Sequence, residues 1–237
     1  MAETMTEPVA DAAEVLRALA VLHPDQTDVI ELRAIGVRSR QWPNVTSGYF
    51  LDRQECAQFA AMLSPLAEGV YFTLNRINPA LLARAVNRLR GRDDSSETTA
   101  DHHVSRRLWL PVDCDPVRPK GISATEEERG WALARAYAIR SHLWSEGWSS
   151  PVVADSGNGT HLLYQVDLDV ADGDYVKRTI ETLARRFNDE RVHIDVTVFN
   201  PARIWKLYGT LARKGDHAPS IGRPHRLARL LEVPGDG

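Results

Sequence analysis

The segment Arg107-Leu108-Trp109-Leu110-Pro111-Val112-Asp113-Cys114-Asp115 decides the fold of this sequence. Its apolar run at 107–112 is typical of a buried strand, and two carboxylates follow directly at the end of that strand. The preceding stretch, 91–105, is polar and shows no periodicity. We expect this stretch to be a linker that closes an N-terminal α/β module at 1–105 and leaves 106–237 as a second module.

The residues after this strand predict the order β-α-β-β-α-β. A helix is expected at 123–147, because Glu126 follows Ser123 by three residues, as in a capping box. Strands are expected at 152–154 and 162–166 around an Asn-Gly turn, and a helix at 173–187 and a strand at 193–198 complete the order. This is the split βαβ unit of ferredoxin-like and RNA-recognition-type domains, in which the first strand is central. The predicted class is therefore α+β, with an RRM-like (ferredoxin-like split βαβ) module packed against the N-terminal module.

The N-terminal module shows periodicities of both kinds. Helical spacing of apolar residues predicts helices at 11–22 and 53–66, the second capped by Asp52, and Asn78-Pro79 predicts the start of a helix at 78–90. Shorter apolar runs at 30–34, 49–51 and 70–74 predict strands. Both modules therefore contain helices and strands.

Composition limits the class of protein. The chain has 237 residues, 43% of them hydrophobic, but no run long enough to span a membrane and no secretory signal at its start, so we expect a cytoplasmic protein without a membrane partner. Its two cysteines, Cys56 and Cys114, are far apart and have no zinc-ligand spacing.

Charge is distributed unevenly along the chain. The net charge is −3, yet the segment 203–229 carries seven cations and one acid, so this segment contributes +6 and the rest of the chain −9. The cations are Arg203, Lys206, Arg213, Lys214, Arg223, Arg226 and Arg229. Such a concentration predicts that some of them face phosphate groups.

The predicted topology brings four distant side chains together. Asp113 and Asp115 are two residues apart, so both lie on one face of the strand. His161 begins the antiparallel third strand and Asp195 lies early in the antiparallel fourth strand, so both reach the same end of the central strand. Hard oxygen ligands suit Mg²⁺ or Mn²⁺, and two such ions about 3.5–4 Å apart can clamp an in-line phosphoryl displacement.

Each of these elements also has a purely structural explanation. Strand ends often carry aspartates, residues 156–159 can be a simple turn, and His161 or Asp195 can be a buried, paired side chain. Arg203 and Lys206 are three residues apart, so in a regular strand they face opposite sides, and only one of them can reach the site unless a bulge intervenes. The convergence of Asp113, Asp115, His161 and Asp195 on one strand end favours a catalytic site.

These motifs resemble those of the archaeo-eukaryotic primase superfamily, especially primase-polymerases of phages, plasmids and other mobile elements. An apolar strand ending in D-x-D corresponds to Asp113 and Asp115, and the motif S-G-N-G-x-H corresponds to residues 156–161. A strand aspartate followed by a basic stretch corresponds to Asp195 and residues 200–215. The resemblance covers residues from about Val70 onward.

The resemblance implies a role for each matched residue. Asp113, Asp115 and Asp195 would be the catalytic residues and would hold two ions of Mg²⁺ or Mn²⁺. The incoming nucleotide would be bound by Ser156, Gly157, Asn158, Gly159, His161, Arg203 and Lys206. Lys214, Arg223 and Arg226 are expected to contact nucleic acid.

The function predicted from these residues is that of a template-directed nucleotidyltransferase, a DNA primase/polymerase that adds NTPs or dNTPs by a two-metal mechanism. Its partners would be a single-stranded DNA template and primer, nucleoside triphosphates, and a helicase or accessory replication domain that supplies what a catalytic core lacks. A metal-dependent nuclease or phosphodiesterase would use the same carboxylates with water as nucleophile. A non-catalytic replication-initiator module is the third alternative, although the aromatic stacking motif of RNA-recognition domains is absent.

Overall fold

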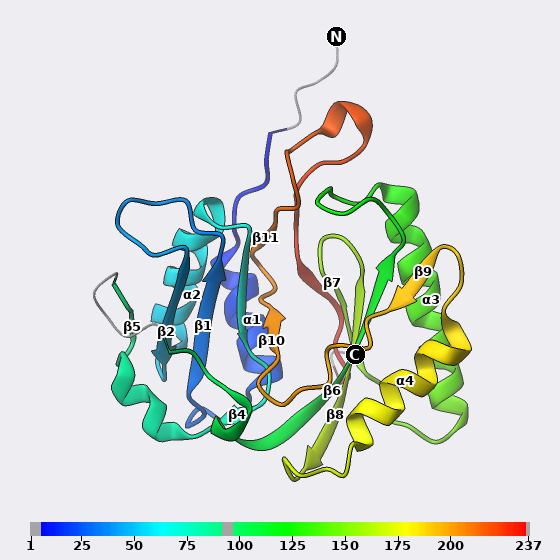
Figure 1. Cartoon of the computed structure of the whole chain (residues 1–237), viewed down its shortest axis with the longest axis horizontal. Helices are drawn as coiled ribbons and strands as arrows, with labels where there is room; N and C mark the ends of the chain where they lie inside the picture. Colours follow the sequence, from blue (N-terminus) through cyan, green and yellow to red (C-terminus); the bar gives the residue numbers. More distant parts are fainter. Residues whose placement is uncertain (1–5, 92–96, 236–237) are drawn as a thin grey trace.

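Two curved antiparallel sheets lie side by side in the computed structural model, which describes residues 6–91 and 97–235 (Figure 1). The first sheet has the strand order β10-β3-β1-β2-β5, and the second has the order β13-β7-β8-β6-β4. Strand β9 pairs with the C-terminal end of β6, on the side opposite β8. A short third sheet joins β11 to β12. This mixture of helices and antiparallel sheets confirms the predicted α+β class.

Residues of the first half build most of the first sheet. Its strands are β1 (Ile30–Ile35), β2 (Val45–Phe50), β3 (Gly69–Thr73), β5 (Arg88–Leu89) and β10 (Ile204–Lys206). Two helices, α1 (Ala12–Leu22) and α2 (Arg53–Leu63), pack against each other, and α2 also packs on β1. The side chain of Asp52 caps α2 by accepting hydrogen bonds from two backbone amides, as expected.

The second sheet is built around one long strand, β6 (Val104–Pro116). The other strands are β4 (Arg76–Ile77), β7 (Val152–Asp155), β8 (Thr160–Leu168), β9 (Val192–Ile194) and β13 (Arg229–Glu232), and the small sheet consists of β11 (Leu211–Ala212) and β12 (Arg226–Leu227). Helix α3 (Glu126–Ser145) packs on β6 and β8, and α4 (Tyr175–Phe187) packs on β9. As the sequence order predicted, β6 is central here, with β8 and β9 antiparallel on its two sides.

Three local expectations were wrong. The helix expected at 78–90 is a 3₁₀ helix, Pro79–Arg84, followed by β5, because the next residues pair with β2. Helix α3 is capped by Thr125, whose capping-box partner is Glu128, so Ser123 lies outside it. The strand expected at 193–198 ends at Ile194, which leaves Asp195 just beyond it.

The chain exchanges strands between the two sheets. Strand β10, drawn in orange in Figure 1, pairs with β3 in the first sheet, whereas β4 from the first half pairs with β6. One hydrophobic core runs through both halves, from Val15 in α1 to Leu230 in β13. The residue boundary expected at 105 therefore does not coincide with the boundary between the sheets, and β10 carries residues of the basic segment to the end of β6.

Candidate active site

The end of β6 presents two carboxylates on one face. Asp113 pairs across the sheet with His161 on β8, and Asp115 pairs with His193 on β9. Cys114 between them points to the opposite face and is fully buried. The period of two therefore places both carboxylates on one face of the strand, as the sequence predicted.

Asp195 reaches the same end of β6 through its backbone. Its amide N–H donates a hydrogen bond of 2.9 Å to the carbonyl oxygen of Asp113. Its carboxylate Oδ1 accepts bonds from the backbone amide and the hydroxyl of Thr197, at 2.8 and 2.7 Å. This turn holds Asp195 beside Asp113 although the residue lies outside β9.

His161 is a buried neighbour of Asp113. Its Nε2 atom lies 3.5 Å from Asp113 Oδ1, and its Nδ1 atom lies 2.9 Å from the hydroxyl of Tyr208. Burial, with the nearby Lys206 charge, lowers the pKa of His161 to about 3, so the imidazole is neutral at physiological pH. The structure thus brings His161 to the carboxylates as expected.

The loop 156–159 forms a hydrogen-bonded turn at the same place. The amides of Gly157, Asn158 and Gly159 donate to the side chains of Asp155 and Ser156, so all three bonds stay within the loop. The side chain of Asn158 accepts from the amide of Ala124 before α3. Ser156 and Asn158 line the cavity described below, whereas the two glycines allow close packing.

Gly159 packs closely against the backbone of β6. A Cβ atom there would lie 2.5 Å from the carbonyl oxygen of Cys114 and 3.1 Å from Asp115 Oδ1. We expect Gly159→Ala to lower the free energy of unfolding by about 1–3 kcal/mol, because it forces the loop away from β6. Thermal unfolding measures this loss. Gly130→Ala is the control: nothing lies within 4 Å of its Cβ position in α3, and it should stabilise by about 1 kcal/mol. Equal effects of both substitutions would contradict the close-packing argument.

Arg203 and Lys206 take different places: Lys206 ends β10, whereas Arg203 lies just before it. Lys206 is buried, lines the cavity and donates a bond of 2.6 Å from Nζ to the carbonyl oxygen of Leu211. Burial, with the neighbouring Lys214 charge, lowers the pKa of Lys206 to about 7. Arg203 donates instead to the carbonyl and hydroxyl oxygens of Thr197. It therefore braces the turn that carries Asp195 and does not line the cavity.

The three residues expected to contact nucleic acid, Lys214, Arg223 and Arg226, also lie in different places. Lys214 lines the cavity, and its charge acts on Asp113, Asp115 and Lys206. Arg223 forms two hydrogen bonds with Glu128, and Arg226 is paired with Glu126 and the carbonyl oxygen of Ala124. The two arginines thus attach the C-terminal segment to the first turn of α3, and their contact with nucleic acid stays a prediction.

We expect the double substitution Arg223→Ala and Arg226→Ala to lower thermal stability, because it breaks both attachments to α3 and removes the arginine partner of the largely buried Glu128. The salt dependence of single-stranded DNA binding, measured on the same variant, tests the original expectation. If the arginines contact the DNA backbone, the log–log slope becomes shallower by about 0.7 for each lost contact. An unchanged melting temperature would contradict the structural role.

A cavity of about 120 Å³ lies where these residues meet. Besides Asp113, Asp115, His161, Ser156, Asn158 and the two lysines, it is lined by Glu68, Tyr71, Arg118, Ala212 and Arg213, whereas Asp195 does not line it. The first-half residues Glu68 and Tyr71 were not expected, because only the pairing of β3 with β10 brings them here. Arg118, whose Nη1 lies 3.8 Å from Asp115 Oδ1, was also missed, although a cation three residues after the D-x-D pair was visible in the sequence.

Negative charge accumulates around Asp113. Burial raises the pKa of Asp113 well above its ordinary value, and the charges of Asp115 and Asp195 raise it further. Asp113 Oδ1 is a buried acceptor that has no hydrogen-bond partner. Such an oxygen, beside two more carboxylates, is suited to a hard cation. Within 6–91 and 97–235, however, the side chains as placed form no group of three acids, histidines or cysteines close enough to hold one ion.

No family model matches the chain, and no curated protein matches it. The chain does match solved structures. The AEP domain (PP-N190) of the primase-polymerase of cyanophage S-2L superposes with a TM-score of 0.51 and 16% identity, over 97% of this chain and 94% of that one. Primase RepB′ gives a TM-score of 0.47 and 13% identity over 95% and 57% of the two chains. The catalytic domain of RepB′ in complex with initiator DNA gives 0.45 and 14% over 94% and 87%.

The likeness to the cyanophage domain identifies the fold. The chain has the fold of an archaeo-eukaryotic primase (AEP) domain, which is the fold that the sequence motifs suggested. Among the helices of the described residues, none combines the length and apolar character needed to cross a bilayer.

Proposed function

We propose that this protein is a template-directed nucleotidyltransferase of the AEP superfamily, a DNA primase/polymerase that adds NTPs or dNTPs to a strand paired with single-stranded DNA. The observation that carries the proposal is the meeting of Asp113 and Asp115 with His161 and Lys206 in the cavity at the end of β6, where a backbone bond to Asp113 holds Asp195 alongside. The AEP fold of the chain adds to it. In this proposal the β6-centred unit is the RRM-like catalytic module, as its strand order suggests.

The three carboxylates would hold two divalent ions, Mg²⁺ or Mn²⁺. The unpaired Asp113 Oδ1 and the mutual repulsion of the acids support this assignment. When bound, the ions would supply the positive charge that stabilises the phosphorane-like transition state and the leaving oxygen.

The remaining side chains would bind the triphosphate. His161 and Lys206 present nitrogen donors from opposite sheets, and Lys214 adds a charge to the lining of the cavity. The cavity is too small for a whole nucleotide, but an adjoining one of about 360 Å³ shares Glu68, Arg213 and Lys214 with it. The triphosphate would therefore lie at the end of β6, and the rest of the nucleotide would extend toward Arg38 and Gly215.

The test is incorporation by the purified protein. Labelled NTPs or dNTPs are supplied with Mg²⁺ or Mn²⁺ and with primed or unprimed single strands. We expect product longer than the primer, or new primers on unprimed template, and none without metal or with Asp113→Asn.

The same assay separates the alternatives. Shortening of the strand without added nucleotides would replace the proposal by a nuclease with water as nucleophile. Binding of single strands with neither extension nor cleavage would indicate a replication-initiator module. Activity that appears only after a helicase or accessory replication protein is added would identify the partner that the catalytic core requires.

A further inference from the structure

Two buried side chains, those of Trp205 and Tyr208, connect the first sheet to His161. The indole Nε1 of Trp205, on β10, donates a bond of 3.0 Å to the hydroxyl of Tyr208, which lies 2.9 Å from His161 Nδ1. Trp205, Tyr208 and His161 are each 3% exposed or less. We propose that Tyr208, itself held by Trp205, is a positioning residue that keeps the ring proton of His161 on Nε2, the nitrogen that faces Asp113.

Counting donors and acceptors decides where the protons lie. The indole nitrogen can only donate, so the Tyr208 oxygen is the acceptor of that bond. Within the described part of the chain, His161 Nδ1 is the other hydrogen-bond partner of this hydroxyl. If Nδ1 carried a proton, the hydroxyl would accept twice and its own proton would be buried without an acceptor, at a cost of about 1–3 kcal/mol. In the favoured arrangement the Tyr208 hydroxyl donates a hydrogen bond to an unprotonated Nδ1 of His161.

The consequence concerns the other side of the ring. With Nδ1 bare, the single ring proton lies on Nε2, which is 3.5 Å from Asp113 Oδ1. An N–H there can donate to a carboxylate or phosphate oxygen, but it has no lone pair for a metal ion. His161 is therefore a hydrogen-bond donor of the site and not a metal ligand. The proton position follows from the hydrogen bonds alone, whereas its use on a phosphate oxygen rests on the proposed function.

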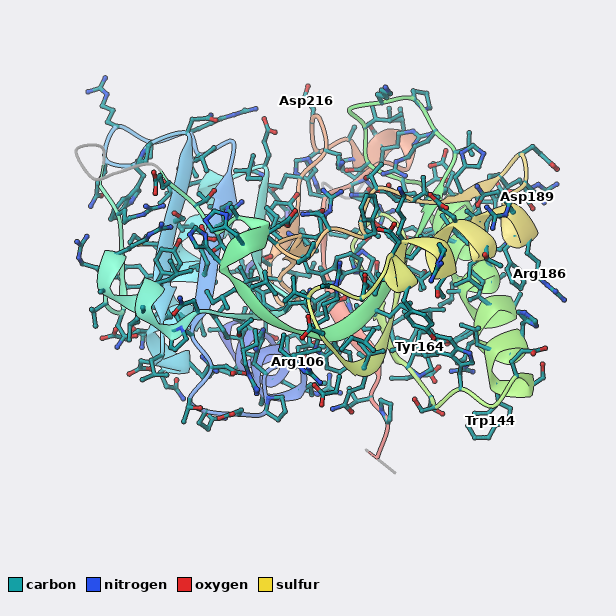
Figure 2. The ribbon with its side chains drawn as sticks, turned by 60° about the horizontal axis from the view of Figure 1, so that its bottom comes forward. Arg106, Trp144, Tyr164, Arg186, Asp189 and Asp216 are labelled. Atoms are coloured by element: carbon teal, nitrogen blue, oxygen red, sulfur yellow. The ribbon has the colours of Figure 1, made fainter. Side chains whose placement is uncertain are left out.

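The chain offers a matched control for the hydroxyl. Tyr164, on the same strand β8, is also buried, packs edge-on against Trp148 at 5.4 Å, and has a hydroxyl without a hydrogen-bond partner. It is an odd number of residues from His161, so it lies on the opposite face of β8. Figure 2 labels Tyr164. Tyr164→Phe thus removes a buried hydroxyl without touching the connection to His161.

The decisive measurement is nitrogen NMR of the full chain labelled in its histidine rings, with the His161 signals assigned by their loss in His161→Gln. The proton is expected on Nε2 in the wild-type protein and in Tyr164→Phe, and Tyr208→Phe should give a mixture of tautomers or the Nδ1–H form. A wild-type ring with its proton on Nδ1, or an unchanged tautomer in a folded Tyr208→Phe, would overturn the proposal. The wild-type spectrum decides even if Tyr208→Phe does not fold.

Kinetics then tests the consequence. We expect Tyr208→Phe to raise the KM for nucleotide or lower kcat by about 10-fold or more, with Tyr164→Phe close to wild type. If His161 shows the expected tautomer but the protein incorporates no nucleotide, the proposed function is rejected and the positioning role of Tyr208 remains. Normal kinetics in Tyr208→Phe with an altered tautomer would reject the use of Nε2–H on the substrate.

Discussion

Asp113→Asn should abolish nucleotide incorporation and at the same time stabilise the fold. The amide keeps the shape of the carboxylate but loses its charge, so we expect a decrease in rate of about a thousandfold or more. The gain in stability follows from the raised pKa of Asp113, caused by burial and by Asp115 and Asp195. Ionising this group costs more in the folded than in the unfolded chain.

The sign of the pH dependence follows from the same shift. As pH rises from the ordinary aspartate pKa toward the raised folded pKa, the unfolded chain loses its proton first, so the wild-type protein loses stability. Asp113→Asn should lack this loss, so its advantage in melting temperature should be small at acid pH and grow toward neutral pH. A melting temperature measured across this range in metal-free buffer checks it.

Asp167→Asn serves as the control. Asp167 lies at the far end of β8 beside Arg106, which Figure 2 labels, and the bond from Arg106 lowers its pKa. This substitution should leave incorporation unchanged and should not stabilise the protein. Near-normal turnover of Asp113→Asn at the same metal concentration would exclude the catalytic assignment.

Lys206→Met should also weaken nucleotide binding and raise thermal stability. Burial and Lys214 lower the pKa of Lys206 from 10.5 to about 7. This shift corresponds to at most about 5 kcal/mol of cost at neutral pH, part of which the bond to Leu211 offsets. The apolar side chain removes the cost, so we expect higher thermal stability. Loss of a charged donor to phosphate should raise the KM for nucleotide about 10- to 100-fold.

The pH dependence has a defined direction here too. Between pH values near 10.5 and 7 the unfolded chain holds the Lys206 proton and the folded chain releases it, so the wild-type protein loses stability as pH falls through this range. The advantage of Lys206→Met should therefore be full near pH 7 and vanish toward pH 10.5. Lys177→Met, on α4, is the control and should show neither effect. A lower thermal stability of Lys206→Met at neutral pH would contradict this argument. It would mean that neighbouring groups compensate the burial of the Lys206 ammonium group more fully than its lowered pKa indicates.

Much of the site was visible in the sequence because local geometry determines it. The period of two along β6 aligns Asp113 with Asp115, and a split βαβ order places His161 and Asp195 at the same strand end. These arguments use only strand alternation and antiparallel pairing. They failed where pairing with a distant segment decides the outcome, as at Pro79–Arg84, where contact with β2 ended the expected helix.

By itself, the sequence determined the α+β class, the central position of β6 and the set of carboxylates at its end. Only the tertiary structure decided which cations reach that end. Strand β10 crosses to the first sheet, so Lys206 becomes buried in the cavity while Arg203 braces the turn of Asp195. Arg223 and Arg226 are held by acids of α3 that lie about a hundred residues earlier in the chain. Charge counts along a chain do not show such pairings, because the energy of a cation depends on its burial and on neighbours that only folding supplies.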